Sequence, residues 1–298
     1  MPHRTWWARF HRQFRRANPF QGDCLPTRVP LFLPGRPSLP FPHLWNYREL
    51  FLILAWRDIS VRYKQTVFGV AWAVLRPLLT MIVFTIIFSK VAKLPSEGDA
   101  PYALLVFAGM LPWYLFSSAL AGCADSLITN SNLISKVYFP RLIIPLAAIV
   151  TALIDFLISF VILLALMLWY QYPPNWGLLT LPLFVLMGVL ASIGPGLYVS
   201  SLNVKYRDFR YVIPFILQFG LYISPVGFSS SAVPEVWRLA YSINPIVGVI
   251  DGFRWAILGG ESQLYWPGFY LSLGVIAVFL WIGIRQFKAT EKSFADII

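Results

Sequence analysis

Residues 143–169 of this chain read IIPLAAIVTALIDFLISFVILLALMLW, a run of 27 residues in which Asp155 is the one charged side chain. As a helix at 1.5 Å per residue, the run is about 40 Å long, which exceeds the roughly 30 Å of hydrocarbon in a bilayer. So long an apolar helix is typical of a membrane span and unusual in a soluble domain. The run therefore predicts an integral membrane protein.

The composition of the chain agrees with this prediction. Of the 298 residues, 58% are hydrophobic and 12% are charged, and the mean hydropathy is +0.66. Further windows are also apolar and long enough to cross a bilayer. With the first window, they are Val70–Ser89, Tyr102–Gly122, Ile143–Trp169, Leu178–Leu202, Tyr211–Phe228 and Leu264–Ile284. We expect an all-α integral membrane protein with six transmembrane helices within residues 67–287.

The distribution of basic residues predicts the orientation of these spans. The formal charge is +11, and eleven of the 24 Lys and Arg residues precede the first window. Most others fall in alternate loops or in the C-terminal tail, residues 288–298, and the opposite side holds Lys90, Lys93, Arg238 and Arg254. Because basic residues near span ends stay on the cytoplasmic side, we expect both termini in the cytoplasm. The charge then reflects topology and attraction to membrane lipids, with no nucleic-acid partner.

Two segments precede the first span. Residues 1–43 are rich in Arg and Pro, which disfavours helix and predicts an extended cytoplasmic tail against lipid headgroups. Residues 44–66 have helix-forming composition with an imperfect polar stripe, which predicts an amphipathic helix at the membrane interface. Its candidate residues are Arg57, Asp58, Arg62, Tyr63 and Lys64. A plain membrane-surface helix and a helix packed partly on protein both remain open.

The second and third spans are joined by Asn132-Leu-Ile-Ser-Lys-Val-Tyr-Phe-Pro-Arg141. A loop that meets only water is expected to be small and polar, whereas this one displays Leu133, Ile134, Val137, Tyr138 and Phe139 around two positive charges. A partner typically covers apolar surface of this kind. We therefore predict a docking element formed by Asn132, Leu133, Lys136, Val137, Tyr138, Phe139, Pro140 and Arg141.

The segment between the fifth and sixth spans is too apolar for a free loop and too interrupted for a span. Pro234 and the pair Asn244-Pro245 are typical helix starts, and Gly259-Gly260 is a typical helix stop. We expect short outer helices within about residues 232–260. Irregular backbone near a membrane is stable when protein covers it or when it lines a wet cavity, so we predict a gate or vestibule on the outer face.

Two ionisable residues fall within predicted spans. Asp155 is too short to reach the membrane surface, so it must face the bundle interior, a partner or water. Arg76 either reaches a lipid headgroup or pairs with Asp155. Aromatic residues also gather near span ends, where they form an interfacial belt or stack against sugars. The candidates for a channel or gate are Trp72, Trp113, Tyr114, Phe116, Phe228, Trp237 and Trp255.

Catalytic groups are sparse. The histidines His3, His11 and His43 lie in the N-terminal tail, and Cys24 and Cys123 are far apart. The sequence contains no G-x-x-x-x-G-K-[ST], H-E-x-x-H or G-x-S-x-G string. We therefore expect that the chain is not an enzyme, binds no cofactor or metal, and does not hydrolyse ATP by itself.

Taken in order, these motifs resemble the membrane subunits of ATP-binding-cassette (ABC) exporters for cell-surface polysaccharides, which move lipid-linked O-antigen, capsule or teichoic-acid polymers. The resemblance begins at Asp58-Ile-Ser-Val-Arg-Tyr-Lys-Gln-Thr66 and continues through the connector 132–141. It resumes at Val204-Lys-Tyr-Arg-Asp208 and Ser224-Pro-Val226, and ends with Asn244-Pro245 and Arg254.

The resemblance implies a homodimer in the bacterial plasma (inner) membrane, bound to two copies of an ATPase subunit that holds ATP and Mg. The connector would be a cytoplasmic coupling helix seated in that ATPase. A polyprenyl-linked glycan would pass between the two permease copies, and short outer helices would gate its exit. The candidate gate residues are Pro225, Asn244, Pro245 and Arg254.

Two other classes of function remain open. A polytopic glycosyl or acyl transferase acting on lipid-linked sugars would need acidic groups that converge at one membrane face. Few such groups are present, and the candidates on the cytoplasmic side are Asp125 and Asp208. An ion-coupled carrier would use Asp155 within the third span.

Overall fold

The computed structural model describes residues 47–64, 69–98, 100–137, 139–206, 208–259, 262, 264–291 and 294. The predicted tail of residues 1–43 lies outside them, as do Tyr138 of the connector, Gly260 and most of residues 288–298. No strand occurs in the described part, which is helical and joined by short turns, as an all-α protein requires.

The described helices follow the apolar pattern of the sequence. In chain order they are α2 (Arg48–Lys64), α3 (Gly69–Phe84), the π-helix η2 (Thr85–Val91), α4 (Tyr102–Thr129), α5 (Ser131–Ile134), α6 (Ile143–Trp169), the 3₁₀ turn η3 (Trp176–Thr180), α7 (Leu181–Lys205), α8 (Phe209–Ile223), the 3₁₀ turn η4 (Ser230–Ala232), α9 (Glu235–Tyr241), α10 (Pro245–Leu258) and α11 (Trp266–Thr290). The π-helix η2 continues α3 without a break and has no counterpart among the sequence predictions.

Within the described residues, five helical stretches are long and apolar enough to cross a bilayer. They are Ala71–Val91, Tyr102–Thr129, Ile143–Trp169, Trp176–Lys205 and Trp266–Thr290, and they match five of the six predicted windows. The chain is therefore a multi-pass membrane protein. The remaining window, Tyr211–Phe228, overlaps the 15-residue helix α8, which begins at Phe209, is about 22 Å long and ends at Ile223. The helix ends there because Ser224 precedes Pro225 and is held in the extended region, at φ −81° and ψ 153°.

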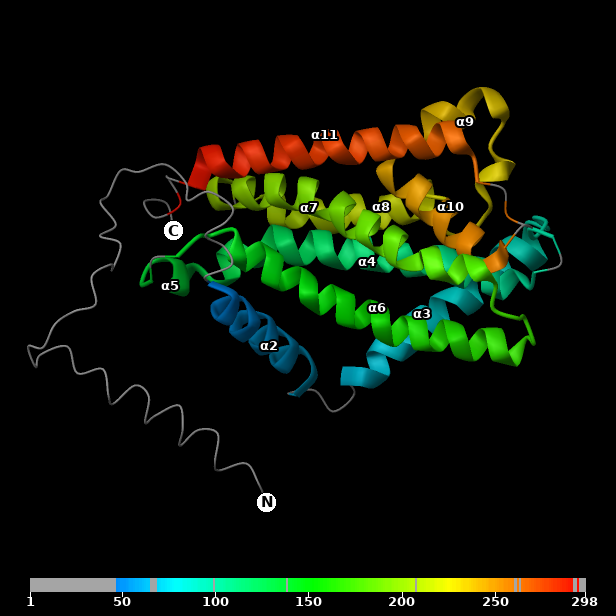
Figure 1. The fold of residues 1–298 in the computed structure, drawn as a ribbon, viewed down its shortest axis with the longest axis horizontal. Coiled ribbons are helices and arrows are strands. Elements are labelled where there is room, and N and C mark those ends of the chain that lie inside the picture. The colour runs from blue at the N-terminus through cyan, green and yellow to red at the C-terminus, as the bar shows by residue number, and fades with distance from the viewer. Residues whose placement is uncertain are drawn as a thin grey trace, which may run out of the picture. The chain divides into compact units, whose positions relative to one another are not determined.

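The core is built around α4, which is the most deeply buried of the long helices. It packs on α6 and α7, and α7 packs in turn on α11, so that these helices run side by side in Figure 1. Glycines permit the closest of these approaches, because a Cβ atom on Gly283 of α11 would lie 2.0 Å from the carbonyl oxygen of Gly194 in α7. The short helix α5 lies at one end of the bundle, and α9 lies at the other (Figure 1).

Candidate functional site

The helix before the first span packs on protein. α2 contacts α6 and runs obliquely to it (Figure 1). Leu54 and Ala55 are buried against the bundle, while the apolar side chains of Leu52, Ile53 and Trp56 are exposed. One apolar face of α2 therefore packs on protein while another remains open, as expected for a helix packed partly on protein. Of the predicted interface residues, Lys64 is exposed at the end of the helix.

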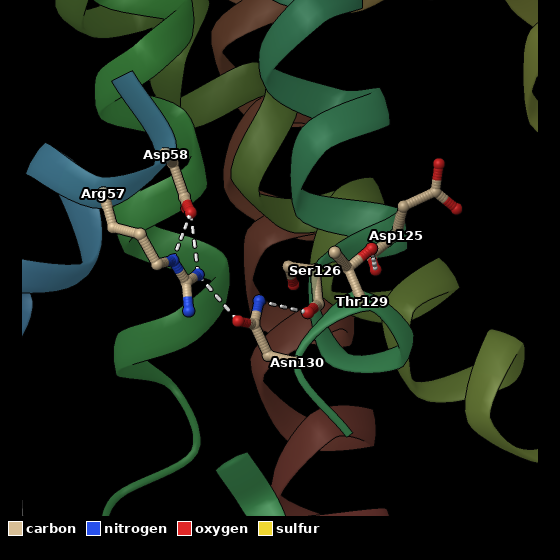
Figure 2. A network of polar contacts seen from close by, with 6 residues as sticks. All are labelled: Arg57, Asp58, Asp125, Ser126, Thr129 and Asn130. Carbon is tan, nitrogen blue, oxygen red and sulfur yellow. Dashed lines mark hydrogen bonds and ion pairs between the residues drawn. The ribbon is translucent and has the colours of Figure 1, made fainter. Parts of the chain in front are cut away.

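A polar network joins α2 to the C-terminal end of α4, next to the connector, as Figure 2 shows. Arg57 forms an ion pair with Asp58 at 2.7 Å, and its Nη2 also donates to Asn130 Oδ1 at 2.6 Å. Asn130 Nδ2 in turn donates to the carbonyl oxygen of Ser126 at 2.8 Å. The side chain of Asp125 points away from this network (Figure 2). Arg57 was a predicted site residue, whereas Asn130 was missed, although it immediately follows an apolar span.

The connector between α4 and α6 is only partly exposed. Ile134 and Phe139 are buried within the chain, at 6% and 5% exposure, so the prediction that the whole apolar set is displayed is wrong. These two side chains close the base of the turn against the hydrophobic core. Asn132 and Lys136 are exposed, Val137 is 51% exposed, and Leu133 and Pro140 are half-buried. The outward surface is thus smaller and more polar than the sequence indicated.

Arg141, the last residue of the predicted docking element, is bonded within the chain. Its guanidinium donates to the carbonyl oxygen of Glu291 and lies 5.7 Å from the centre of the Phe294 ring. Its backbone N–H donates to Glu291 Oε1 at 3.4 Å. Arg141 therefore anchors the connector to the end of α11, which leaves Lys136 as the outward positive charge.

The carboxylate of Asp155 interacts with two side chains of α2. Arg62 Nη2 lies 2.6 Å from Asp155 Oδ2, and the Tyr63 hydroxyl donates to Asp155 Oδ1. Burial, and then the hydrogen bond to Asp155, raises the pKa of Tyr63, so the phenol keeps the proton that it donates. Arg76 instead lies over the ring of Tyr114, 5.6 Å from its centre. The possible pair between Arg76 and Asp155 does not form, because the end of α2 occupies the aspartate.

At the opposite end of the bundle, Arg254 of α10 is fully buried and holds an irregular segment in place. Its Nη1 and Nη2 donate to the carbonyl oxygens of Phe228 at 2.7 Å and Val226 at 3.0 Å. Its Nε donates to the carbonyl oxygen of Leu105 in α4 at 3.4 Å. The carboxylates of Glu97 and Asp251 lie close enough to act on its charge.

The helix-start predictions for the segment between α8 and α11 are confirmed. Asn244 caps α10 by accepting from the backbone N–H of Ile246 at 3.3 Å, and Pro245 takes the first helical position. The Asn244 amide also donates to Ser224 Oγ at 3.0 Å, beside the buried Pro225. Gly259 ends α10 with φ +72°, a conformation that favours glycine. All four predicted gate residues therefore gather around the segment that follows α8.

Comparison with known proteins assigns the family. The family model for ABC-2 type transporters matches residues 49–258, which is well over half of the chain and includes α2, the connector and the Arg254 segment. This chain belongs to the ABC-2 type transporter family. As an ABC-2 type chain, it is a transporter component rather than an enzyme.

Curated relatives of this ABC-2 type chain are similar over nearly their whole lengths. An O-antigen export system permease protein, RfbA, of Klebsiella pneumoniae is 28% identical over 260 residues, which cover 84% of this chain and 95% of that protein. RfbA of Myxococcus xanthus is 26% identical over 258 residues, covering 86% and 97%. The polysialic acid transport protein KpsM of Escherichia coli is 25% identical over 246 residues, covering 80% and 92%.

The predicted channel aromatics of this ABC-2 type chain are not brought together. Trp113 and Phe116 of α4 are buried, with ring centres 5.7 Å apart, because α4 lies in the core. Trp72 and Trp237 are exposed on α3 and α9, at 62% and 66%. Phe228 and Trp255 are half-buried. In the part of the chain that the structure describes, no three His, Cys, Asp or Glu side chains are arranged to hold a metal ion.

Proposed function

We propose that this chain is the permease of an ABC exporter that moves a lipid-linked cell-surface polysaccharide out of a bacterial cell. The curated relatives named for O-antigen export and polysialic acid transport support this substrate class. A separate ATPase subunit, which binds ATP and Mg, drives the export. The protein lies in the plasma (inner) membrane with both termini in the cytoplasm, as its basic residues favour.

The observation that carries the proposal is the construction of the connector. Its base is fastened at several points: Arg57 bonds to Asn130, Arg141 bonds to Glu291, and Ile134 and Phe139 are buried. Its tip presents Asn132, Lys136 and Val137 outward. A tip that is pushed while its base is fastened moves the helices that it joins, whereas a loose loop absorbs the displacement. This is what a coupling helix between an ATPase and the spans requires.

The export path lies between two copies of the chain. One cavity, among α2, α3, α4 and α6, has a volume of about 260 Å³, and pockets for drug-sized ligands are usually about 300–1,000 Å³. A polymer therefore needs a larger passage than this cavity provides. Exposed apolar side chains on α3 and α8 supply surface for such an assembly, among them Leu75, Leu79, Phe215 and Phe219.

The outer segment serves as the gate of this passage. Arg254 ties the carbonyl oxygens of Val226 and Phe228 to α10, and Tyr102 of α4 donates to the carbonyl oxygen of Gly227 at 2.7 Å. The segment is thereby held rigid against α4, and α4 is continuous with the connector at its inner end. Movement of α4 at its inner end is thus transmitted to the gate.

The competing functions are less well supported. Asp155 is occupied by Arg62 and Tyr63, so its charge is already balanced and it is a poor site for a transported ion. The Asp125 carboxyl points away from the polar network at the inner end of α4 (Figure 2). Neither geometry favours an ion-coupled carrier or a transferase.

The test of the proposal is to disrupt the tip of the connector. Lys136→Glu and Val137→Glu are made in the full-length permease co-expressed with its ATPase. Both are expected to abolish stimulation of ATP hydrolysis and export, because the new carboxylate would have to lose its hydration at the docked surface without a matching positive charge. Co-purification, ATPase assays and cell-surface polysaccharide measure the effect. Both sites are exposed, so the variants are expected to fold as the wild type does.

Lys205→Glu is the matched control, because Lys205 is an exposed lysine on the same predicted side and at the end of another span. It is expected to leave assembly and export unchanged. Normal assembly and export in Lys136→Glu and Val137→Glu, or equal losses in Lys205→Glu, would refute the role of the connector.

A further inference from the structure

The cavity of about 260 Å³ lies where the end of α2 meets α3, α4 and α6. The polar residues around it come from all four helices. They are Arg62, Tyr63, Arg76, Tyr114, Ser118, Asp155 and Ser159. The cavity has room for several waters. This space fits a small polar group and is slightly smaller than the usual pocket for a drug-sized ligand.

Arg76 lies close to the start of its span. It is five residues after Ala71 in the span Ala71–Val91, which corresponds to about 8 Å along the helix. Its guanidinium stands over the Tyr114 ring, 5.6 Å from the centre, and the side chain is exposed. A basic side chain this near the end of a span can extend to the level of the lipid headgroups. Its positive charge is stabilised there by negative charge close by.

The protein supplies only part of that negative charge. Asp155 is the carboxylate of the cavity, and it is ion-paired with Arg62 at 2.6 Å. Within the described residues, no carboxylate lies within ion-pair distance of Arg76. Two guanidinium groups and one carboxylate leave one positive charge in excess. An arginine held in this way in a cavity is arranged to bind an anion from outside the chain.

The surroundings indicate that this anion is carried by a lipid. Trp72 is 62% exposed and lines the cavity, and Arg76 is itself exposed. The lining helices α3 and α6 also expose Leu79, Leu157 and Val161, which suit a hydrocarbon tail. A free inorganic anion would gain nothing from these apolar side chains.

We propose that this cavity binds the phosphate group of a membrane lipid, with Arg76 as its direct ligand and Arg62 beside it. The planar guanidinium forms paired hydrogen bonds with phosphate oxygens, and the bound anion neutralises the excess charge. The ion pair of Arg62 with Asp155 and the hydrogen bond from Tyr63 hold the end of α2 as one wall of the site. The inference rests on the proposed function only in that a polyprenyl phosphate carrier is one of the lipids that fit.

Binding is tested with the full-length permease purified in detergent with its ATPase. Native mass spectrometry and titration compare three probes: a short-chain polyprenyl phosphate, phosphatidylglycerol and inorganic phosphate. Arg76→Gln is expected to weaken binding of the lipid phosphate at least about tenfold, because charge-assisted hydrogen bonds are lost. Lys90→Gln is the control, since Lys90 is an exposed cation on the same helical run outside the cavity, and it is expected to bind as the wild type does.

The three probes separate the sources of the phosphate. Selective binding of the polyprenyl phosphate assigns the site to a glycan carrier, and equal binding of both lipids assigns it to lipid phosphate in general. Competition by inorganic phosphate at equal concentration would overturn the lipid assignment. Unchanged lipid binding in Arg76→Gln would overturn the site itself. This holds even if the variant changes how two copies of the chain associate.

Two further variants keep the test decisive. Arg76→Lys retains the charge if Arg76→Gln does not fold, and it is expected to bind several-fold more weakly than the wild type because the paired geometry is lost. Wild-type affinity in Arg76→Lys would overturn the direct role of the guanidinium. Lys136→Glu is expected to lose ATPase stimulation and keep lipid binding, so failure of the proposed function is distinguishable from failure of this site.

Discussion

Replacing Arg254 by Met tests whether one buried side chain holds the outer segment together. The guanidinium is fully buried and donates to backbone carbonyl oxygens of Val226, Phe228 and Leu105. The Met side chain is similar in length to the aliphatic part of Arg but has no hydrogen-bond donor. The substitution therefore leaves these carbonyl groups without their partner and removes a positive charge that interacts with the carboxylates of Glu97 and Asp251.

The magnitude follows from the contacts. The bonds to Phe228 at 2.7 Å and Val226 at 3.0 Å are well formed, and each buried group left unsatisfied costs about 1–3 kcal/mol. The bond to Leu105 at 3.4 Å is weak and adds little. Because the terms share one side chain and are not additive, we expect a loss of roughly 3–5 kcal/mol in the free energy of unfolding. That loss is a large part of the total stability of about 5–15 kcal/mol of a protein.

The assay is the melting temperature of the purified permease in detergent, with export measured in cells. Arg254→Met is expected to lower the melting temperature by about 6 °C or more. Arg238→Met is the control, because Arg238 is a half-buried arginine of the same region whose Nη2 donates to the carbonyl oxygen of Ser231 at 3.2 Å. It is expected to cost about 1 kcal/mol or less. Equal melting temperatures for the two variants would refute the anchoring role of Arg254.

Two further predictions test helix packing and the link between α2 and the connector. Gly283→Ala is expected to destabilise the protein by about 1–3 kcal/mol, because its Cβ would lie 2.0 Å from a backbone oxygen of Gly194, while Gly274→Ala on the same helix has nothing within 4 Å and is expected to be neutral or stabilising in the same thermal melt. Arg57→Gln and Asn130→Ala are each expected to reduce export while ATP hydrolysis continues, with a stability loss of only about 1 kcal/mol because Arg57 is 42% exposed. Full additivity of the two changes in the double variant would contradict a direct coupling between them.

The positions of the long helices could be predicted because they depend on local composition. In a membrane, the backbone N–H and C=O groups of an apolar run must form their hydrogen bonds within the run. Its length and hydropathy therefore determine a helix whatever its neighbours are. The same holds for the start of α10, where Asn244 and Pro245 act on backbone atoms one or two residues away. The short helix α8 departed from the prediction for an equally local reason: Pro225 terminates the helix within an apolar window.

The exposure of the connector could not be predicted from composition. Its apolar residues indicated a docking surface, but Ile134 and Phe139 turn inward. Whether an apolar side chain in a turn meets a partner or its own core depends on the direction of the turn relative to α4 and α6. That direction is a property of the packed helices rather than of the ten residues.

The amino-acid sequence by itself determined that this chain is a helical membrane protein, located five helices long enough to cross a bilayer, and indicated a connector and an irregular segment between them. Only the tertiary structure decided the partners of the buried charges. Asp155 pairs with Arg62 rather than Arg76, and Arg254 bonds to carbonyl oxygens of residues far away in the chain. The physical reason is that backbone carbonyls are the same at every residue, so the folded packing alone selects those that a buried guanidinium can reach.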